Sequence, residues 1–158
     1  MTDRTWPEDW DDRVAGVGCP MCANQGREET EFGVRILSGE FADVYLQRAA
    51  PLPGYAIAIW REGHVADPTD LNDAAAVGFW IDTVTAARAI AELFAPAKLN
   101  YQTLGNAVPH LHTHIQPRYV DDPAPGHPLP REVTAAAGTV PADTLARQVE
   151  DLRRLIAK

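Results

Sequence analysis

Cysteine, basic residues and long apolar runs are all scarce in this sequence. Two of its 158 residues are cysteines, and 14 Lys and Arg residues stand against 22 Asp and Glu, for a net charge of −8. This balance argues against non-specific nucleic-acid binding, which needs a basic surface. No uninterrupted apolar run approaches the about 20 residues of a membrane span. We therefore expect neither nucleic acid nor membrane as a partner, although a few local donors could hold a phosphate-bearing small molecule.

The two cysteines, Cys19 and Cys22, lie in the stretch CPMC. They are too close together to staple a fold, and in a reducing compartment the pair favours a redox or metal-binding role over a structural disulfide. The N-terminal stretch MTDRTWPEDWDDR is polar and acidic, unlike the apolar core of a secretory signal. We therefore expect a cytoplasmic location.

The first part of the chain predicts three strands and one long helix. β-branched and aromatic residues predict two strands within 31–48 and a central strand within 54–64. A helix is predicted over 70–94, capped by Thr69 or Asp70 and ended by Pro96. Apolar residues recur along this helix at intervals of three and four and predict its buried stripe: Val77, Ile81, Val84, Ala87, Ala91 and Phe94, flanked by Trp80 and Ile90.

The second part predicts a strand pair and a last helix. Residues 98–104 and 109–117 have the pattern of an antiparallel pair joined around Gly105 and Asn106. A Pro-rich, irregular segment over 120–140 and a C-terminal helix over 141–158 follow. Together these elements predict an α+β fold, in which one main helix and a C-terminal helix accompany an antiparallel β-sheet. We expect a single domain over 1–158, with its core in 19–119.

Three of the five histidines, His110, His112 and His114, occupy alternate positions. In a strand, alternate side chains share a face, so the three imidazoles would line one face of the sheet. A lone histidine is usually an ordinary core or surface residue. Three on one stripe repel one another when protonated and give up apolar burial, which points to a function.

The stretch HLHTHIQ, followed by Pro117 and Arg118, resembles the histidine triad motif. Residues 44–71 also resemble the strand, Pro/Gly turn, strand and His-bearing loop that precede the main helix in that family. The resemblance covers 19–119 and is greatest to the dinucleoside polyphosphate hydrolase branch. It implies hydrolysis or transfer of nucleotidyl groups on a nucleotide substrate, and it implies a homodimer formed through the main helix and an edge strand.

The resemblance gives separate roles to the histidines. His112 would attack the α-phosphorus and form a covalent nucleotidyl-histidine, and His114 would bind a phosphate oxygen or orient the nucleophile. An imidazole is largely neutral at pH 7, and it is nucleophilic at one nitrogen when the other donates to a backbone carbonyl. Hydrolysis, phosphorolysis or nucleotidyl transfer through the same histidine all remain open, as does a non-catalytic nucleotide-binding module.

Two asparagines are further candidates for phosphate binding. By resemblance, Asn100 and Asn106 would hydrogen-bond the phosphates, although turns and caps also favour Asn. The sequence departs from the family pattern at three places. Ala107 replaces a residue that often has a hydroxyl, Pro109 removes a backbone donor before the first triad histidine, and Gln116 replaces an apolar residue.

The family resemblance also favours a metal role for CPMC. A redox motif would need a parallel βαβ order, which the chain lacks, and the two cysteines could also be plain surface thiols. Related proteins join such a pair to two histidines around zinc, and here those would be His64 and His110. Two thiolates and two imidazoles form a closed, structural Zn²⁺ site.

A few aromatic and histidine residues have no assigned role. Trp60 and the region of Phe32 and Ile36 could stack on a base, but we expect these residues in the core. His127 has no partner at a suitable spacing, and we expect it to be exposed.

Overall fold

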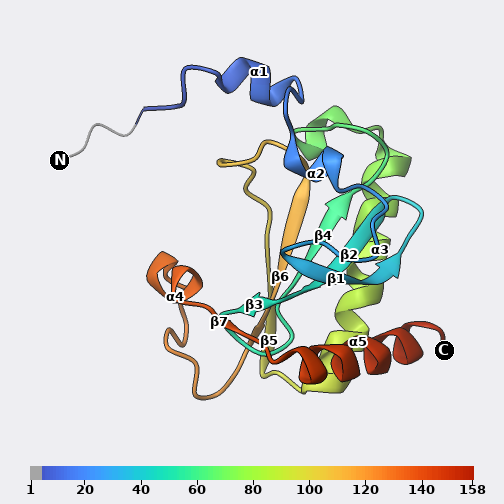
Figure 1. Ribbon diagram of the computed structural model, residues 1–158, viewed down its shortest axis with the longest axis vertical. Coiled ribbons are helices and arrows are strands. Elements are labelled where there is room, and N and C mark those ends of the chain that lie inside the picture. Colours follow the sequence, from blue (N-terminus) through green and yellow to red (C-terminus); the bar gives the residue numbers. More distant parts are fainter. Residues whose placement is uncertain (1–4) are drawn as a thin grey trace.

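A computed structural model describes residues 5–158; residues 1–4, the start of the predicted domain, lie outside the described part of the chain. Its centre is a five-stranded antiparallel sheet with the strand order β1-β2-β4-β6-β5 (Figure 1). The strands are β1 (Gly33–Ser38), β2 (Ala42–Gln47), β4 (Ala56–Trp60), β5 (Lys98–Gln102) and β6 (His112–Arg118). Helices α3 (Asp73–Phe94) and α5 (Ala142–Ile156) lie along one side of this sheet, which confirms the predicted α+β class.

Short elements complete the fold. They are α1 (Trp10–Val14), α2 (Pro20–Ala23), a 3-10 helix η1 (Pro68–Asp70), α4 (Arg131–Ala135), and a second small sheet of β3 (Ala49–Ala50) and β7 (Gly138–Thr139). The Pro-rich segment is irregular apart from α4 and β7. Its first residues are held by the buried Arg118, which pairs with Asp122 at 2.5 Å and donates to the carbonyls of Ala124 and His127.

The register of the strands gives the sheet two different faces. Asp43 on β2 lies opposite Ile59 on β4, which lies opposite His112 on β6. Side chains directly opposite one another share a face, so these residues form one row across the sheet. Residues of the intervening positions, such as Ala58 and Ile115, pack into the hydrophobic core under α3. One face therefore builds the core and the other carries His112 and His114.

The main helix begins later than the sequence predicts. Asn72 caps it by accepting a hydrogen bond from the backbone N–H of Ala75 at 2.9 Å. Thr69 and Asp70 are instead used in η1, where Asp67 is the cap and forms a capping box with Asp70. The capping residues were the right type, but they start the short helix that precedes the main one.

The predicted buried stripe of α3 was wrong. The buried residues of α3 are Phe79, Thr83, Ala86, Ala87, Ala89 and Ile90, so only Ala87 and the flanking Ile90 of the predicted set are buried. Val77, Trp80 and Ile81 are 58%, 47% and 56% exposed. Because α3 is apolar on both sides, periodicity alone could not choose the face that packs on the sheet.

Helix α3 is long enough and apolar enough to cross a membrane. Its 22 residues include a stretch with a mean hydropathy of 1.2, and 39% of that stretch is buried inside the protein. The core helices of soluble proteins can have the same length and hydropathy. The packing of Phe79 and Ile90 against the sheet supports a core helix here.

Candidate active site and metal cluster

The ring of His112 is held in one tautomer. Its Nδ1 lies 2.6 Å from the backbone oxygen of His110, and since a carbonyl only accepts, Nδ1 carries the proton. The lone pair is therefore on Nε2. Burial lowers the pKa of His112, opposed by this backbone hydrogen bond, so the ring is neutral at pH 7. A neutral imidazole with a fixed lone pair is suited to nucleophilic attack.

His114 lies next to His112 on the same face of β6. The two ring centroids are 5.0 Å apart, and Nδ1 of His114 lies 2.7 Å from the hydroxyl of Tyr55. Burial raises the pKa of Tyr55, so its O–H remains intact and can donate to this nitrogen. In the tautomer in which the Tyr55 hydroxyl donates to Nδ1, the proton of His114 is on Nε2, where it can bind a phosphate oxygen. Sequence reasoning missed Tyr55, although it precedes Ile57 and Ile59 at the same alternation.

Tyr55→Phe is expected to lower kcat more than it raises KM. The change removes one buried hydrogen bond, worth about 1 kcal/mol, and frees the His114 ring to adopt the other tautomer. We expect kcat to fall about fivefold or more in steady-state kinetics. An unchanged kcat with a raised KM would show that Tyr55 only contributes to binding.

His114 is expected to stay neutral throughout the physiological pH range. Burial, together with the charge of His112, lowers its pKa to about 4. Because the folded pKa lies below the unfolded value of 6.5, the unfolded chain binds more protons between pH 6.5 and 4, and this contribution to stability is lost as pH falls through that window. Histidine-selective NMR should therefore show no titration of His114 between pH 5 and 8. A midpoint near 6.5 would contradict this environment.

Among the described residues, neither candidate asparagine has a hydrogen bond to His112. Asn100 lies opposite Gln116, and its side-chain oxygen accepts a hydrogen bond from Arg118 at 2.7 Å. Asn106 is exposed in the loop before His110. The role of Asn100 and Asn106 in phosphate binding stays a prediction, and Asn100 could serve it with its Nδ2 donor while its oxygen accepts from Arg118.

Cys19, Cys22, His64 and His110 come together in space. Their ligand atoms all lie within 4.8 Å of one another. Nδ1 of His110 is 3.4 Å from the sulfur of each cysteine, and Nδ1 of His64 is 3.4 Å from that of Cys22. Sulfur and nitrogen ligands of a tetrahedral zinc ion are about 3.6 Å apart. The spacing of these four donors therefore fits zinc.

The far nitrogens of both rings are also fixed for metal binding. Nε2 of His110 donates to the carbonyl of Trp60 at 2.8 Å, and Nε2 of His64 donates to that of Val14 at 3.0 Å. Both Nδ1 atoms consequently have free lone pairs directed at the cysteines, as in metal sites with ordered outer contacts. Burial and the adjacent Cys19 sulfur raise the pKa of the Cys22 thiol to about 11. A bound cation is therefore needed for both thiols to lose their protons.

The three triad histidines do not form one continuous stripe. Strand β6 begins at His112, and His110 lies before it with a ring that is fully buried in the cluster. Strand alternation therefore applies to His112 and His114 only. The carbonyl of His110 still bonds His112, so a single residue links the cluster to the proposed nucleophile.

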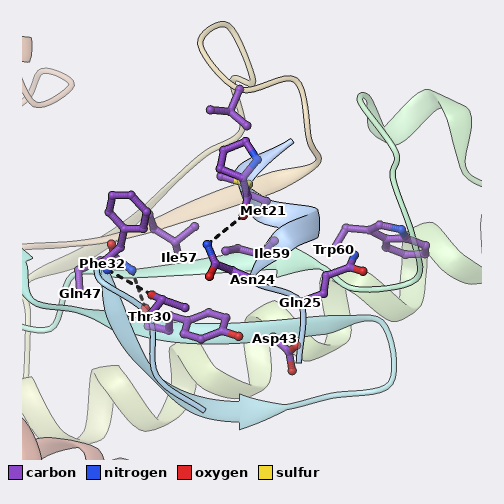
Figure 2. A pocket seen from close by; sticks show the side chains of 13 residues that line it. Met21, Asn24, Gln25, Thr30, Phe32, Asp43, Gln47, Ile57, Ile59 and Trp60 are labelled. Atoms are coloured by element: carbon purple, nitrogen blue, oxygen red, sulfur yellow. Dashed lines mark hydrogen bonds between the residues drawn. The ribbon is translucent and has the colours of Figure 1, made fainter. Parts of the chain in front are cut away.

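An apolar pocket lies beside the triad histidines, over β2 and β4. It has a volume of about 240 Å³, with a floor of Ile57 and Ile59, which are opposite His114 and His112. Figure 2 shows Met21 and Asn24 from the region of α2 above these strands. Phe32 also lines the pocket and is 56% exposed, which corrects its predicted place in the core.

The other side chains without assigned roles lie where the sequence predicts. Ile36 and Trp60 are in the core, and Trp60 also borders the pocket. His127 is exposed.

Comparisons with known proteins identify the family. The HIT domain model matches residues 35–121, more than half of the chain, and the chain belongs to this family. A comparison with curated proteins found no match. Among solved structures, histidine triad protein blr8122 from Bradyrhizobium japonicum is 25% identical, with a TM-score of 0.71 over 80% of this chain and 92% of that one.

Two more distant structures share the fold. A Zn-bound histidine triad family protein from Mycobacterium smegmatis is 22% identical, with a TM-score of 0.62 over 88% of this chain and 93% of that one. A histidine triad nucleotide-binding protein, ST2152 from Sulfolobus tokodaii, is 16% identical, with a TM-score of 0.67 over 88% and 92%. Family membership implies activity of the nucleotide-binding and hydrolase type.

Proposed function

We propose that the protein is a nucleotide hydrolase that cleaves at the α-phosphate of a dinucleoside polyphosphate or a nucleoside phosphoramidate. The observation that carries this proposal is the hydrogen bond from Nδ1 of His112 to the carbonyl of His110, at 2.6 Å. It leaves Nε2 of a buried, neutral ring as the nucleophile. The apolar pocket beside it would hold the base, since ligand pockets are mostly apolar with a few polar groups.

The reaction would proceed in two displacements. Nε2 of His112 attacks the α-phosphorus, an N–P bond forms, and the P–O or P–N bond to the leaving group breaks. A polyphosphate leaves as an anion, whereas an amine takes up a proton from solvent as it leaves. His114 stabilises the charge on the non-bridging oxygens by donating from Nε2. Water then attacks phosphorus, the N–P bond breaks, and a nucleoside monophosphate leaves while His112 becomes neutral again.

We also propose that Cys19, Cys22, His64 and His110 hold a structural zinc ion. Four protein ligands close the coordination sphere, so the ion would fix the backbone rather than take part in the reaction. Gly16 supports this packing: with φ of +87°, it lies so close to His64 that a Cβ there would be 2.8 Å from the ring. The ion would thus tie the N-terminal segment and His110 to the sheet.

The same histidine could instead serve a phosphorylase or a nucleotidyltransferase, and a module that only binds nucleotides is the third candidate. Diadenosine tetraphosphate and a fluorogenic nucleoside phosphoramidate, each supplied with and without phosphate, separate the three. Turnover without phosphate supports hydrolysis, and a nucleoside diphosphate product formed only with phosphate supports phosphorolysis. Binding of either compound without turnover would support a module that only binds nucleotides.

We propose a homodimer formed through α3 and the edge strand β5. Val77, Trp80 and Ile81 of α3 are exposed, and the ring of Trp80 lies 5.1 Å from that of Tyr101 on β5. Together they form an apolar patch of the kind found at interfaces.

Trp80→Glu is expected to shift the protein from dimer to monomer. A buried tryptophan at the centre of an interface commonly contributes about 2 kcal/mol or more, so the dissociation constant should rise about 30-fold or more. Light scattering across a concentration series measures this change. Trp6→Glu, at a 60% exposed tryptophan outside the patch, is the control. Equal masses for wild type and Trp80→Glu would contradict this interface.

A further inference from the structure

One buried acid lines the mostly apolar pocket beside His112 and His114. Asp43 is 2% exposed, and its Oδ2 is a buried atom without a hydrogen-bond partner in the described residues. Its Oδ1 lies 3.4 Å from Nη1 of Arg35 and 3.9 Å from Nη1 of Arg61. A buried carboxylate oxygen without a partner costs free energy. Asp43 also lines the pocket beside His112 and His114, so a ligand that turns this oxygen toward the cavity by a side-chain rotation would supply the missing donor.

Neighbouring polar side chains of the pocket already have partners. The hydroxyl of Tyr45 donates to the carbonyl of Arg27, and the amide of Gln47 donates to the carbonyl of Tyr45. The amide of Gln25 donates to the carbonyl of Gly63. Asp43 is the lining side chain that carries a charge, and its free oxygen can recognise only a hydrogen-bond donor.

The register of the sheet relates Asp43 directly to the nucleophile. Asp43, Ile59 and His112 form one row across three adjacent strands. Two strand spacings separate the acid from His112 by about 10 Å. A nucleoside 5′-phosphate extended across Ile59 spans a comparable length, so its base edge would meet Asp43 while its phosphorus meets His112. Figure 2 shows Asp43 at the lower edge of the group of lining residues and Phe32 at its left.

We propose that Asp43 is a specificity residue that selects guanine. This inference rests on the proposed function, because it assigns a base to the same nucleotide site. Guanine presents two adjacent donors, N1–H and the N2 amine, and a carboxylate can accept both in parallel. Oδ2 is free, and the long contacts of Oδ1 to the two arginines leave it able to accept as well. Adenine places an acceptor, N1, against the carboxylate and is disfavoured.

Calorimetric titration of the zinc-loaded protein with GMP, IMP and AMP tests this inference. Since a bidentate pair discriminates strongly between bases, GMP should bind about tenfold or more tighter than AMP. IMP, which keeps N1–H but lacks the amine, should fall between them. Equal affinities for GMP and AMP, with nucleotide hydrolysis intact, would overturn the guanine inference and leave the proposed function standing. Failure to bind or cleave any nucleotide would overturn both.

Asp43→Asn separates base reading from a merely structural role. An amide offers one acceptor and one donor, which matches xanthine, whose N1–H is next to a carbonyl at C2. The variant should therefore prefer XMP to GMP, a preference that general loss of packing would not produce. Glu28→Gln is the matched control, because Glu28 also pairs with Arg35 but lies outside the pocket. Unchanged GMP preference in Asp43→Asn would contradict the proposal, and if this variant does not fold, the wild-type series decides.

Discussion

His112→Ala is expected to abolish turnover while nucleotide binding persists. The substitution removes the only atom proposed to bond phosphorus, and loss of a nucleophile commonly lowers kcat by about 10⁴-fold or more. The pocket over β2 and β4 does not include the His112 side chain, so nucleotide affinity should change little. Steady-state kinetics and calorimetry on the same preparation measure both quantities.

The control for this experiment is His127→Ala. His127 is exposed, and the hydrogen bonds recorded for it use backbone atoms: its N–H donates to the carbonyl of Ala124 and its oxygen accepts from Arg118, so the loss of its ring should leave activity unchanged. His112→Gly with added imidazole is a second check, since free imidazole can occupy the vacated space and attack in place of the side chain. Wild-type turnover in His112→Ala would disprove the assigned mechanism.

Cys22→Ser is expected to remove zinc and destabilise the whole site. Structural zinc contributes directly to the free energy of folding, and a serine hydroxyl is a poor ligand for this ion. We expect about one zinc per wild-type chain and close to none in the variant by elemental analysis. The unfolding temperature should fall by about 10 °C or more. Activity should fall as well, because the cluster positions His110, whose carbonyl holds Nδ1 of His112.

Ala23→Ser is the matched control for the metal. It adds a hydroxyl in the same short helix, on an exposed residue outside the donor set, so zinc content and stability should match those of wild type. Wild-type protein purified without added zinc that contains no metal, and is as stable as Cys22→Ser, would contradict the zinc proposal.

Local sequence patterns predicted most of the fold. The divided strand region of 31–48 became β1 and β2, and the apolar run after Pro53 became β4, the central strand. These succeeded because strand and turn signals are short-range. The face of α3 could not be predicted in the same way. Val77 and Ile81 are as apolar as the residues that are buried, and tertiary packing chose the side with Thr83 and small alanines.

The residues of the candidate site also fall into two groups: those that local patterns predict and those that depend on tertiary structure. Alternation correctly placed His112 and His114 on one face, opposite the core residue Ile115, whereas His110 precedes the strand and alternation says nothing about its ring. The sequence did not indicate Tyr55 and Asp43 because the importance of each depends on a residue of another strand. Tyr55 is hydrogen-bonded to His114, and Asp43 lies in the same row across the sheet as His112. Register is a property of the folded sheet, and a single sequence does not reveal it.

The most direct test of the central claim is to trap the covalent intermediate. Protein mixed with a dinucleoside polyphosphate, quenched within milliseconds to seconds and digested under alkaline conditions, should carry one nucleoside monophosphate on His112, as located by tandem mass spectrometry. The adduct should be absent from His112→Ala. A nucleotidyl group on another residue, or turnover of wild type in which no adduct forms at any quench time, would contradict the account.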